Sequence, residues 1–83
     1  MKMHERQSWD DLREPGEYLM AVRPDGSKFP VIVCPGCGRP MGCPGHTMVK
    51  EKPLTLVPSV LCVGEKRRIC WHGWVTEGVM EAV

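Results

Sequence analysis

The turn Cys34-Pro35-Gly36-Cys37-Gly38 constrains this chain more than any other feature of its sequence. Two cysteines separated by two residues place their thiolates on one side of a tight loop, and the glycine that follows lets the backbone curl so that its amides face the sulfurs. Such a turn is typical of one half of a tetrahedral zinc site. A redox-active C-x-x-C motif would instead need a βαβ unit around it, and Gly38-Arg39-Pro40 does not begin a helix. We therefore expect Cys34 and Cys37 to bind one structural zinc ion.

The size of the chain explains why it needs a stabilising crosslink such as a metal ion. Its 83 residues, of which 42% are hydrophobic and 25% charged, suffice for a single ordinary globular domain over residues 1–83. Ordering a residue costs roughly 1.5 kcal/mol, and a core this small returns about the same free energy. Five cysteines are an odd number, and the charged N-terminal segment does not resemble a secretory signal. These features favour metal ligation in a reducing cytoplasm over a disulfide framework, and no apolar run is long enough to span a membrane.

The second half of the zinc site has more than one solution. Cys70 and His72 lie in a β-prone segment, where residues i and i+2 point to the same face, so the preferred ligand set is Cys34, Cys37, Cys70 and His72. A competing set takes its second pair from Cys43-Pro-Gly-His46. Cys62 stands between two apolar residues and is expected to be a small buried side chain, although a site that uses it is a third solution.

The rest of the sequence predicts a small β-rich, zinc-ribbon-like fold with two hairpins. Residues 1–16 form an N-terminal segment with at most one short helix, over residues 8–14, which begins at Ser8 and ends at Pro15-Gly16. Residues 17–33 form the first hairpin around Pro24-Asp25-Gly26. Residues 34–83 form the zinc-binding region. It begins with an irregular loop over 34–53, continues with strand residues interrupted at Pro58, and closes with a second hairpin around Thr76-Glu77-Gly78.

Three motifs of the C-terminal region together resemble a family of small proteins carried mainly by bacteriophages and prophages. They are the Cys34-Pro-Gly-Cys37-Gly turn, the segment Pro-Leu-Thr-Leu-Val-Pro58-Ser59-Val60, and Cys70-Trp-His72-Gly-Trp, which is followed by a glycine at 78. The family shows a CPxCG-type turn, a P-T-L-x-P-S-I strand and a Cys/His pair before an aromatic residue. The resemblance covers residues 34–83. It implies a zinc-binding β fold and a phage origin, and it implies no particular activity.

The function expected from the sequence is that of a non-enzymatic zinc-binding protein. The chain has neither the H-x-E motif of zinc deaminases nor an H-E-x-x-H motif, and it contains no asparagine, which an HNH nuclease requires. We expect a protein-interaction module with a protein partner, directed at a host if the gene is phage-borne and acting in the host cytoplasm. Self-association is compatible with the sequence, and a small-molecule substrate is not expected.

Nucleic-acid binding is the alternative function. It rests on five basic residues near tryptophans: Lys50, Lys52, Lys66, Arg67 and Arg68. The formal net charge of +1 speaks against a wide phosphate-binding surface, so any such surface must be local.

Overall fold

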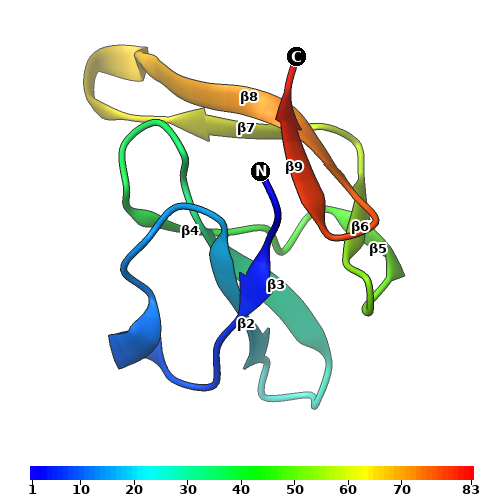
Figure 1. The fold of residues 1–83 in the computed structure, drawn as a ribbon. Helices are drawn as coiled ribbons and strands as arrows, with labels where there is room; N and C mark the ends of the chain where they lie inside the picture. Colours follow the sequence, from blue (N-terminus) through cyan, green and yellow to red (C-terminus); the bar gives the residue numbers. More distant parts are fainter.

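The computed structural model describes all 83 residues as nine short strands in three sheets, with two single-turn 3₁₀ helices and no α-helix (Figure 1). The first sheet has the order β1-β2-β3-β4, the second is the pair β5-β6, and the third has the order β7-β8-β9. The strands of the first two sheets are β1 (His4–Glu5), β2 (Glu17–Val22), β3 (Lys28–Val33), β4 (Pro40–Gly42), β5 (Thr47–Lys50) and β6 (Thr55–Val57). Those of the third are β7 (Val60–Val63), β8 (Ile69–Thr76) and β9 (Val79–Ala82).

The first sheet is built on the antiparallel pair β2 and β3. The turn between them is closed by Asp25, whose Oδ1 accepts hydrogen bonds from the amide and the hydroxyl of Ser27 at 2.9 and 2.6 Å, while Gly26 takes a positive φ of 89°. β3 then forms the middle of the molecule, because its alternate residues are buried on opposite faces. Ile32 belongs to the main core, and Val31 and Val33 pack on the other side with Leu12 of the N-terminal segment.

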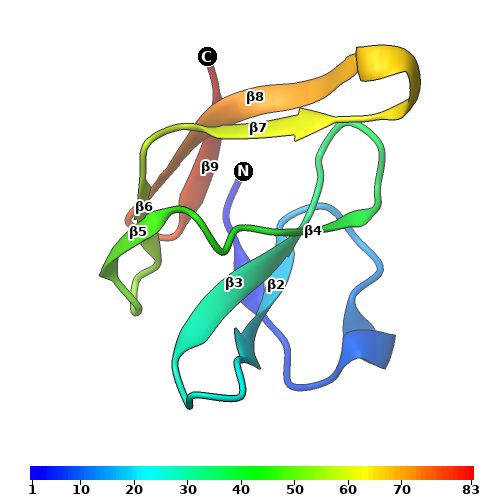
Figure 2. The same ribbon diagram turned by 180° about the vertical axis from the view of Figure 1, so that it is seen from behind.

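The third sheet packs across the first one and supplies much of the main core. β7, β8 and β9 form an antiparallel meander at one end of the molecule, and the loop after β3 reaches up to it (Figures 1 and 2). The N-terminus closes the free side of β9, since the Met1 ammonium donates to the Met80 carbonyl at 2.9 Å and the Met80 amide donates back to Met1 at 2.8 Å. The main core gathers residues from the first and third sheets, from β6 and from the segments beside the strands: Met3, Tyr18, Ile32, Cys43, Leu54, Leu56, Val60, Val75 and Met80.

The structure confirms the expected fold class, a small all-β fold with a cluster of cysteines. Both hairpins form, one over β2 and β3 and the other over β8 and β9. The expected N-terminal helix is only a 3₁₀ turn over Trp9–Asp11, which Ser8 caps by accepting the Asp10 amide at 3.3 Å. Residues 34–53 are not wholly irregular, because β4 pairs with β3 and β5 pairs with β6. Their apolar residues are too few to produce a period, so tertiary pairing forms these strands.

A buried carboxylate ties the N-terminal segment to the first sheet. Oε1 of Glu17 accepts hydrogen bonds from the amides of Glu14 at 2.7 Å and Arg13 at 2.8 Å. Oε2 accepts a hydrogen bond from Nε of Arg6 at 2.6 Å. These donors, the two amides first and the guanidinium after them, lower the pKa of Glu17 from 4.5 to about 2. Glu17 therefore stabilises the folded state only while it is ionised.

Substituting this carboxylate should change how stability depends on pH. Because the folded-state pKa lies below the ordinary value of 4.5, the stabilisation by Glu17 is complete above that pH and is lost as the pH falls toward about 2. Glu17→Gln should lower the urea midpoint at pH 7, and the gap to the wild type should shrink steadily between pH 4.5 and 2. Urea titrations followed by tryptophan fluorescence measure both curves. A gap that is the same at every pH would mean that the charge of Glu17 has no role.

Candidate functional site

The Cys34–Cys37 turn has the local geometry of a metal-binding knuckle. The Gly36 amide lies 3.3 Å from Sγ of Cys34, and the Gly38 amide donates to the Cys34 carbonyl at 2.9 Å. Gly38 has a φ of 74°, which a residue with a side chain rarely adopts. The amide of Arg39 is the main cause of a lowered pKa at Cys37. The turn therefore points backbone donors at its sulfurs and favours the thiolate form at Cys37.

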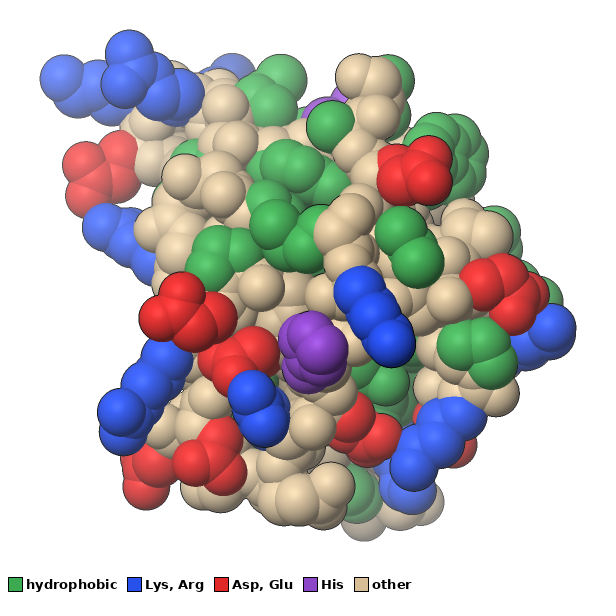
Figure 3. Space-filling view, in the orientation of Figure 1, with side chains coloured by type: hydrophobic (Ala, Val, Ile, Leu, Met, Phe, Trp, Pro, Cys, Tyr) green, Lys and Arg blue, Asp and Glu red, His purple; other side chains and the backbone are tan.

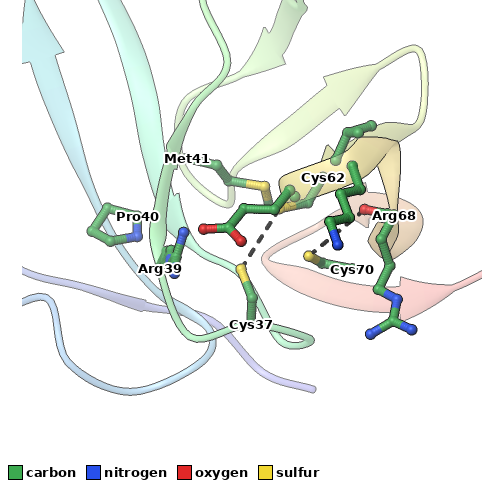
Figure 4. A pocket seen from close by; sticks show the side chains of 11 residues that line it. Cys37, Arg39, Pro40, Met41, Cys62, Arg68 and Cys70 are labelled. Atoms are coloured by element: carbon green, nitrogen blue, oxygen red, sulfur yellow. Dashed lines mark hydrogen bonds between the residues drawn. The ribbon is translucent and has the colours of Figure 1, made fainter.

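Cys62 of β7 joins this pair, and Cys70 of β8 lies beside them. The Sγ atoms of Cys34, Cys37 and Cys62 all lie within 4.8 Å of one another, and that of Cys62 is 3.8 Å from that of Cys37. Cys70 faces the same pocket as Cys37 and Cys62 (Figure 4). In a tetrahedral site with metal–sulfur bonds of about 2.3 Å, neighbouring sulfurs are about 3.8 Å apart. All the cysteines are free thiols, and this donor set fits a metal ion.

A β-bulge explains why Cys70 and His72 do not share a face. Cys62 pairs with Trp71 and Val63 pairs with Ile69, so Cys70 is an extra residue on β8 with no partner on β7. The extra residue interrupts the alternation of side chains. Trp71 packs against the main core, His72 is exposed on the opposite face, and Cys70 is turned into the pocket that Cys62 lines.

The knuckle lies directly on the backbone of β8. A Cβ atom built on Gly36 would be 1.8 Å from the carbonyl oxygen of Cys70, and one built on Gly64 would be 2.9 Å from its Sγ. At Gly36 the neighbouring atom belongs to the backbone, so only glycine permits this approach. The two halves of the cysteine cluster are therefore in close contact through backbone atoms as well as through sulfur.

The competing pair, Cys43 and His46, does not join the cluster. Cys43 is buried in the main core, where burial raises the pKa of its thiol to about 11. Sequence reasoning favoured a buried apolar role for Cys62 and kept a site that uses it as the third solution; the structure places it among the thiols, partly exposed. Its pKa and that of Cys70 are raised, chiefly by burial and then by the neighbouring sulfurs. The structure thus gathers Cys34, Cys37 and Cys62, and Cys70 lines the same pocket as Cys37 and Cys62, while His72 lies elsewhere.

His72 instead faces a serine. Oγ of Ser59 and Nε2 of His72 are 2.9 Å apart, and this hydrogen bond is exposed. Ser59 comes immediately before β7, while His72 is on β8 opposite Leu61, and the antiparallel pairing of the two strands brings them together. A hydroxyl hydrogen-bonded to an imidazole is the central element of a serine nucleophile with its general base. Sequence reasoning missed this pair because it considered His72 only as a metal ligand.

The second histidine of the alternative ligand set also contacts this serine. Nε2 of His46 lies 3.0 Å from the carbonyl oxygen of Ser59. Ser59 is therefore held on two sides, through its side chain by His72 and through its backbone by His46. Two apolar side chains beside the pair, Leu61 and Trp74, remain about half exposed, at 49% and 47%.

The five basic residues considered for nucleic-acid binding do not form one surface. Lys50 pairs with Glu77 at 3.0 Å and Lys52 with Glu5 at 3.3 Å. Lys66, Arg67 and Arg68 lie on and beside the 3₁₀ turn Glu65–Arg67 that joins β7 and β8, at the other end of the third sheet from the β5–β6 pair. Basic side chains project at that corner of the molecule, and others are spread among acidic ones (Figure 3).

Comparison with known proteins assigns the chain to a family. A family model described as "Bacterial ubiquitination-like system serine protease (BubE)" matches residues 3–83. The chain belongs to the BubE family. No curated protein and no solved structure matches the chain.

The family assignment corrects one expectation from the sequence. We expected a protein that is not an enzyme, and this is wrong, because BubE is described as a serine protease. The error came from testing the chain only against metal-dependent and asparagine-dependent enzyme motifs. The chain contains three serines and three histidines, and no short motif marks Ser59 and His72 as a pair. Their contact depends on the register of β7 and β8.

None of the helices in the structure has the length and hydrophobicity that crossing a membrane would require.

A single methyl group at Gly36 should separate the knuckle from β8. Gly36→Ala would place a carbon 1.8 Å from the Cys70 carbonyl oxygen, so the turn must move away. We expect a loss of roughly 3 kcal/mol or more in the free energy of unfolding, which lowers Tm by roughly 12 °C or more. Gly45→Ala is the matched control, because nothing lies within 4 Å of its added Cβ. Thermal melts that coincide for the two variants would show that this contact does not hold the fold.

Proposed function

We propose that this chain is a serine protease in which Ser59 is the nucleophile and His72 the general base. The hydrogen bond of 2.9 Å between Oγ and Nε2 is the observation that carries the proposal. A serine hydroxyl is a weak nucleophile until a base takes its proton as it attacks. The family description supports the same chemistry, since it names a serine protease. We infer from the same description that the substrate is a polypeptide of a bacterial ubiquitination-like system. The cytoplasm, expected from the sequence, is the location we propose for the cleavage.

The reaction follows from the positions of these two side chains. Oγ of Ser59 attacks the scissile carbonyl carbon while its proton passes to Nε2 of His72, and the carbonyl π electrons move to the oxygen. When the tetrahedral intermediate collapses, the C–N bond breaks and the amine leaves with the proton from His72. Water then attacks the acyl-serine ester and gives a proton to His72. That proton returns to Oγ as the carboxyl product leaves, so the enzyme is restored.

The exposed face of the third sheet offers room for a polypeptide substrate. The Ser59–His72 hydrogen bond is exposed, and Leu61 and Trp74 flank it. Because Oγ must reach the scissile carbonyl, the substrate backbone has to lie across this face. Apolar substrate side chains next to the cleaved bond would contact Leu61 and Trp74, whose burial would contribute to binding.

We further propose that Cys34, Cys37, Cys62 and Cys70 hold one zinc ion. Four thiolates form the closed donor set of a structural zinc site, and the 3.8 Å between the sulfurs of Cys37 and Cys62 fits a tetrahedron. Such an ion supplies folding free energy and takes no part in peptide cleavage. The cysteines themselves hold the turn after β3 against β7 and β8, the two strands that bring Ser59 and His72 together.

Labelling with a fluorophosphonate tests the nucleophile without a known substrate. The probe phosphonylates an activated serine hydroxyl and releases fluoride, and peptide mass spectrometry locates the modified residue. We expect labelling at Ser59 in the wild type and none in Ser59→Ala. In His72→Ala the labelling rate should fall by about 10²-fold or more. Ser27→Ala should label like the wild type, because that hydroxyl is hydrogen-bonded to Asp25 and Arg23 within the β2–β3 turn and has no histidine beside it. Unchanged labelling of Ser59→Ala would refute the proposed activity.

Native mass spectrometry separates the metal site from the catalytic pair. We expect one zinc ion per chain, retained in His72→Ala and in the core variant Cys43→Ala, and lost in Cys62→Ser. Chelation of the ion should abolish the β-type circular dichroism spectrum, because zinc binding and folding of such domains are coupled. A His72→Ala protein that loses zinc while Cys62→Ser keeps it would restore the ligand set first expected from the sequence.

The phage origin implied by the sequence resemblance, and the protein partner expected from it, stay predictions. A polypeptide substrate would be one such partner. The dispersed basic residues and their ion pairs with Glu77 and Glu5 give nucleic-acid binding little support.

A further inference from the structure

The backbone of Ser59 lies at a junction between two sheets. β6 ends at Val57 and pairs with β5, while β7 begins at Val60 and pairs with β8. Pro58 and Ser59 join these strands and belong to neither ladder, and Pro58 has no amide hydrogen to donate. A residue outside the ladders lacks the hydrogen bonds that fix strand residues in position. The nucleophile of the proposed protease therefore needs another anchor.

His46 supplies that anchor. Its Nε2 lies 3.0 Å from the Ser59 carbonyl oxygen, which can only accept a hydrogen bond, so Nε2 carries a hydrogen and donates it. His46 immediately precedes β5, whose first residue, Thr47, pairs with Val57 of β6. The hydrogen bond from the His46 side chain thus connects the two chain segments just beyond the last paired residues of β5 and β6. His46 is partly buried.

We propose that His46 is a positioning residue for the nucleophile, an inference that rests on the proposed function of Ser59. By holding the carbonyl of Ser59, His46 fixes the backbone from which Oγ reaches His72 at 2.9 Å. His46 makes no hydrogen bond with the Ser59 hydroxyl or with His72, so the proposal gives it no part in proton transfer. Its role requires only an N–H donor at the position of Nε2. A misplacement of about 1 Å at a reacting group can cost about 10²-fold in rate, which makes such an anchor important.

The donor requirement distinguishes this role from a catalytic one. Glutamine places an amide N–H close to the position of Nε2 but cannot act as an acid or a base at neutral pH. Methionine has a similar length and no donor. Asparagine keeps the donor on a shorter side chain that cannot reach the carbonyl. These three substitutions separate the hydrogen bond from the imidazole chemistry and from the volume of the ring.

The experiment measures the rate of fluorophosphonate labelling at Ser59 over a range of probe concentrations. We expect His46→Met and His46→Asn to lower the maximal rate about 10-fold or more with little change in the half-saturating concentration, because Oγ is misplaced while the probe site remains. His46→Gln should recover most of the wild-type rate. Thermal melts of all variants show whether each one is folded. If His46→Met does not fold, the labelling rate of His46→Asn decides whether the hydrogen bond is needed.

Each outcome bears on one of the two proposals. A glutamine variant as slow as the methionine variant would mean that the imidazole itself is needed, and it would overturn the positioning role. Wild-type rates in the folded methionine or asparagine variants would overturn it as well. If the wild-type protein is labelled at a residue other than Ser59, or Ser59→Ala is labelled normally, it is the proposed function that fails.

Discussion

The close packing of the Cys34–Cys37 turn on the backbone of β8 is the contact on which the rest of the structure depends. Gly36 leaves no room for a side chain above the Cys70 carbonyl, so the turn and the strand have a single way to fit. Through this contact the thiols that follow β3 meet those of β7 and β8. The cysteine cluster therefore links the first and third sheets beside the main core, in which residues of both sheets also meet.

One irregularity in β8 lets a single strand serve two sites. The bulge at Cys70 turns this thiol into the pocket with Cys62 and leaves His72 on the exposed face. Without the extra residue, regular alternation would send Cys70 and His72 to the same side. Cys70 and the Ser59–His72 pair are therefore neighbours on β7 and β8 but point in different directions. The cysteines hold the same two strands whose register sets the distance between Oγ and Nε2.

The sequence predicted features that depend on neighbouring residues. Pro24-Asp25-Gly26 specified the first hairpin because the turn closes on its own side chain, and Cys34-Pro-Gly-Cys37 specified the knuckle for the same reason. The position of Cys70 was not predictable, because the bulge arises from the pairing of β8 with β7 and has no signature in the sequence. Ser59 and His72 are separated by 13 residues, so their contact follows only from that register. Cys62 was misjudged because its apolar neighbours describe its strand, and its own side chain faces the cluster.

The two histidines that hold Ser59 come from different parts of the fold. His46 precedes β5, which pairs with β6, whereas His72 lies in the three-stranded sheet. A hydroxyl inside one sheet would be positioned by that sheet alone. At this junction the position of the hydroxyl depends on both the β5–β6 pairing and the β7–β8 pairing. The arrangement of the proposed nucleophile is thus a property of the assembled domain, and loosening either sheet displaces it. Within these 83 residues the proposed activity and the folding rest on the same few contacts.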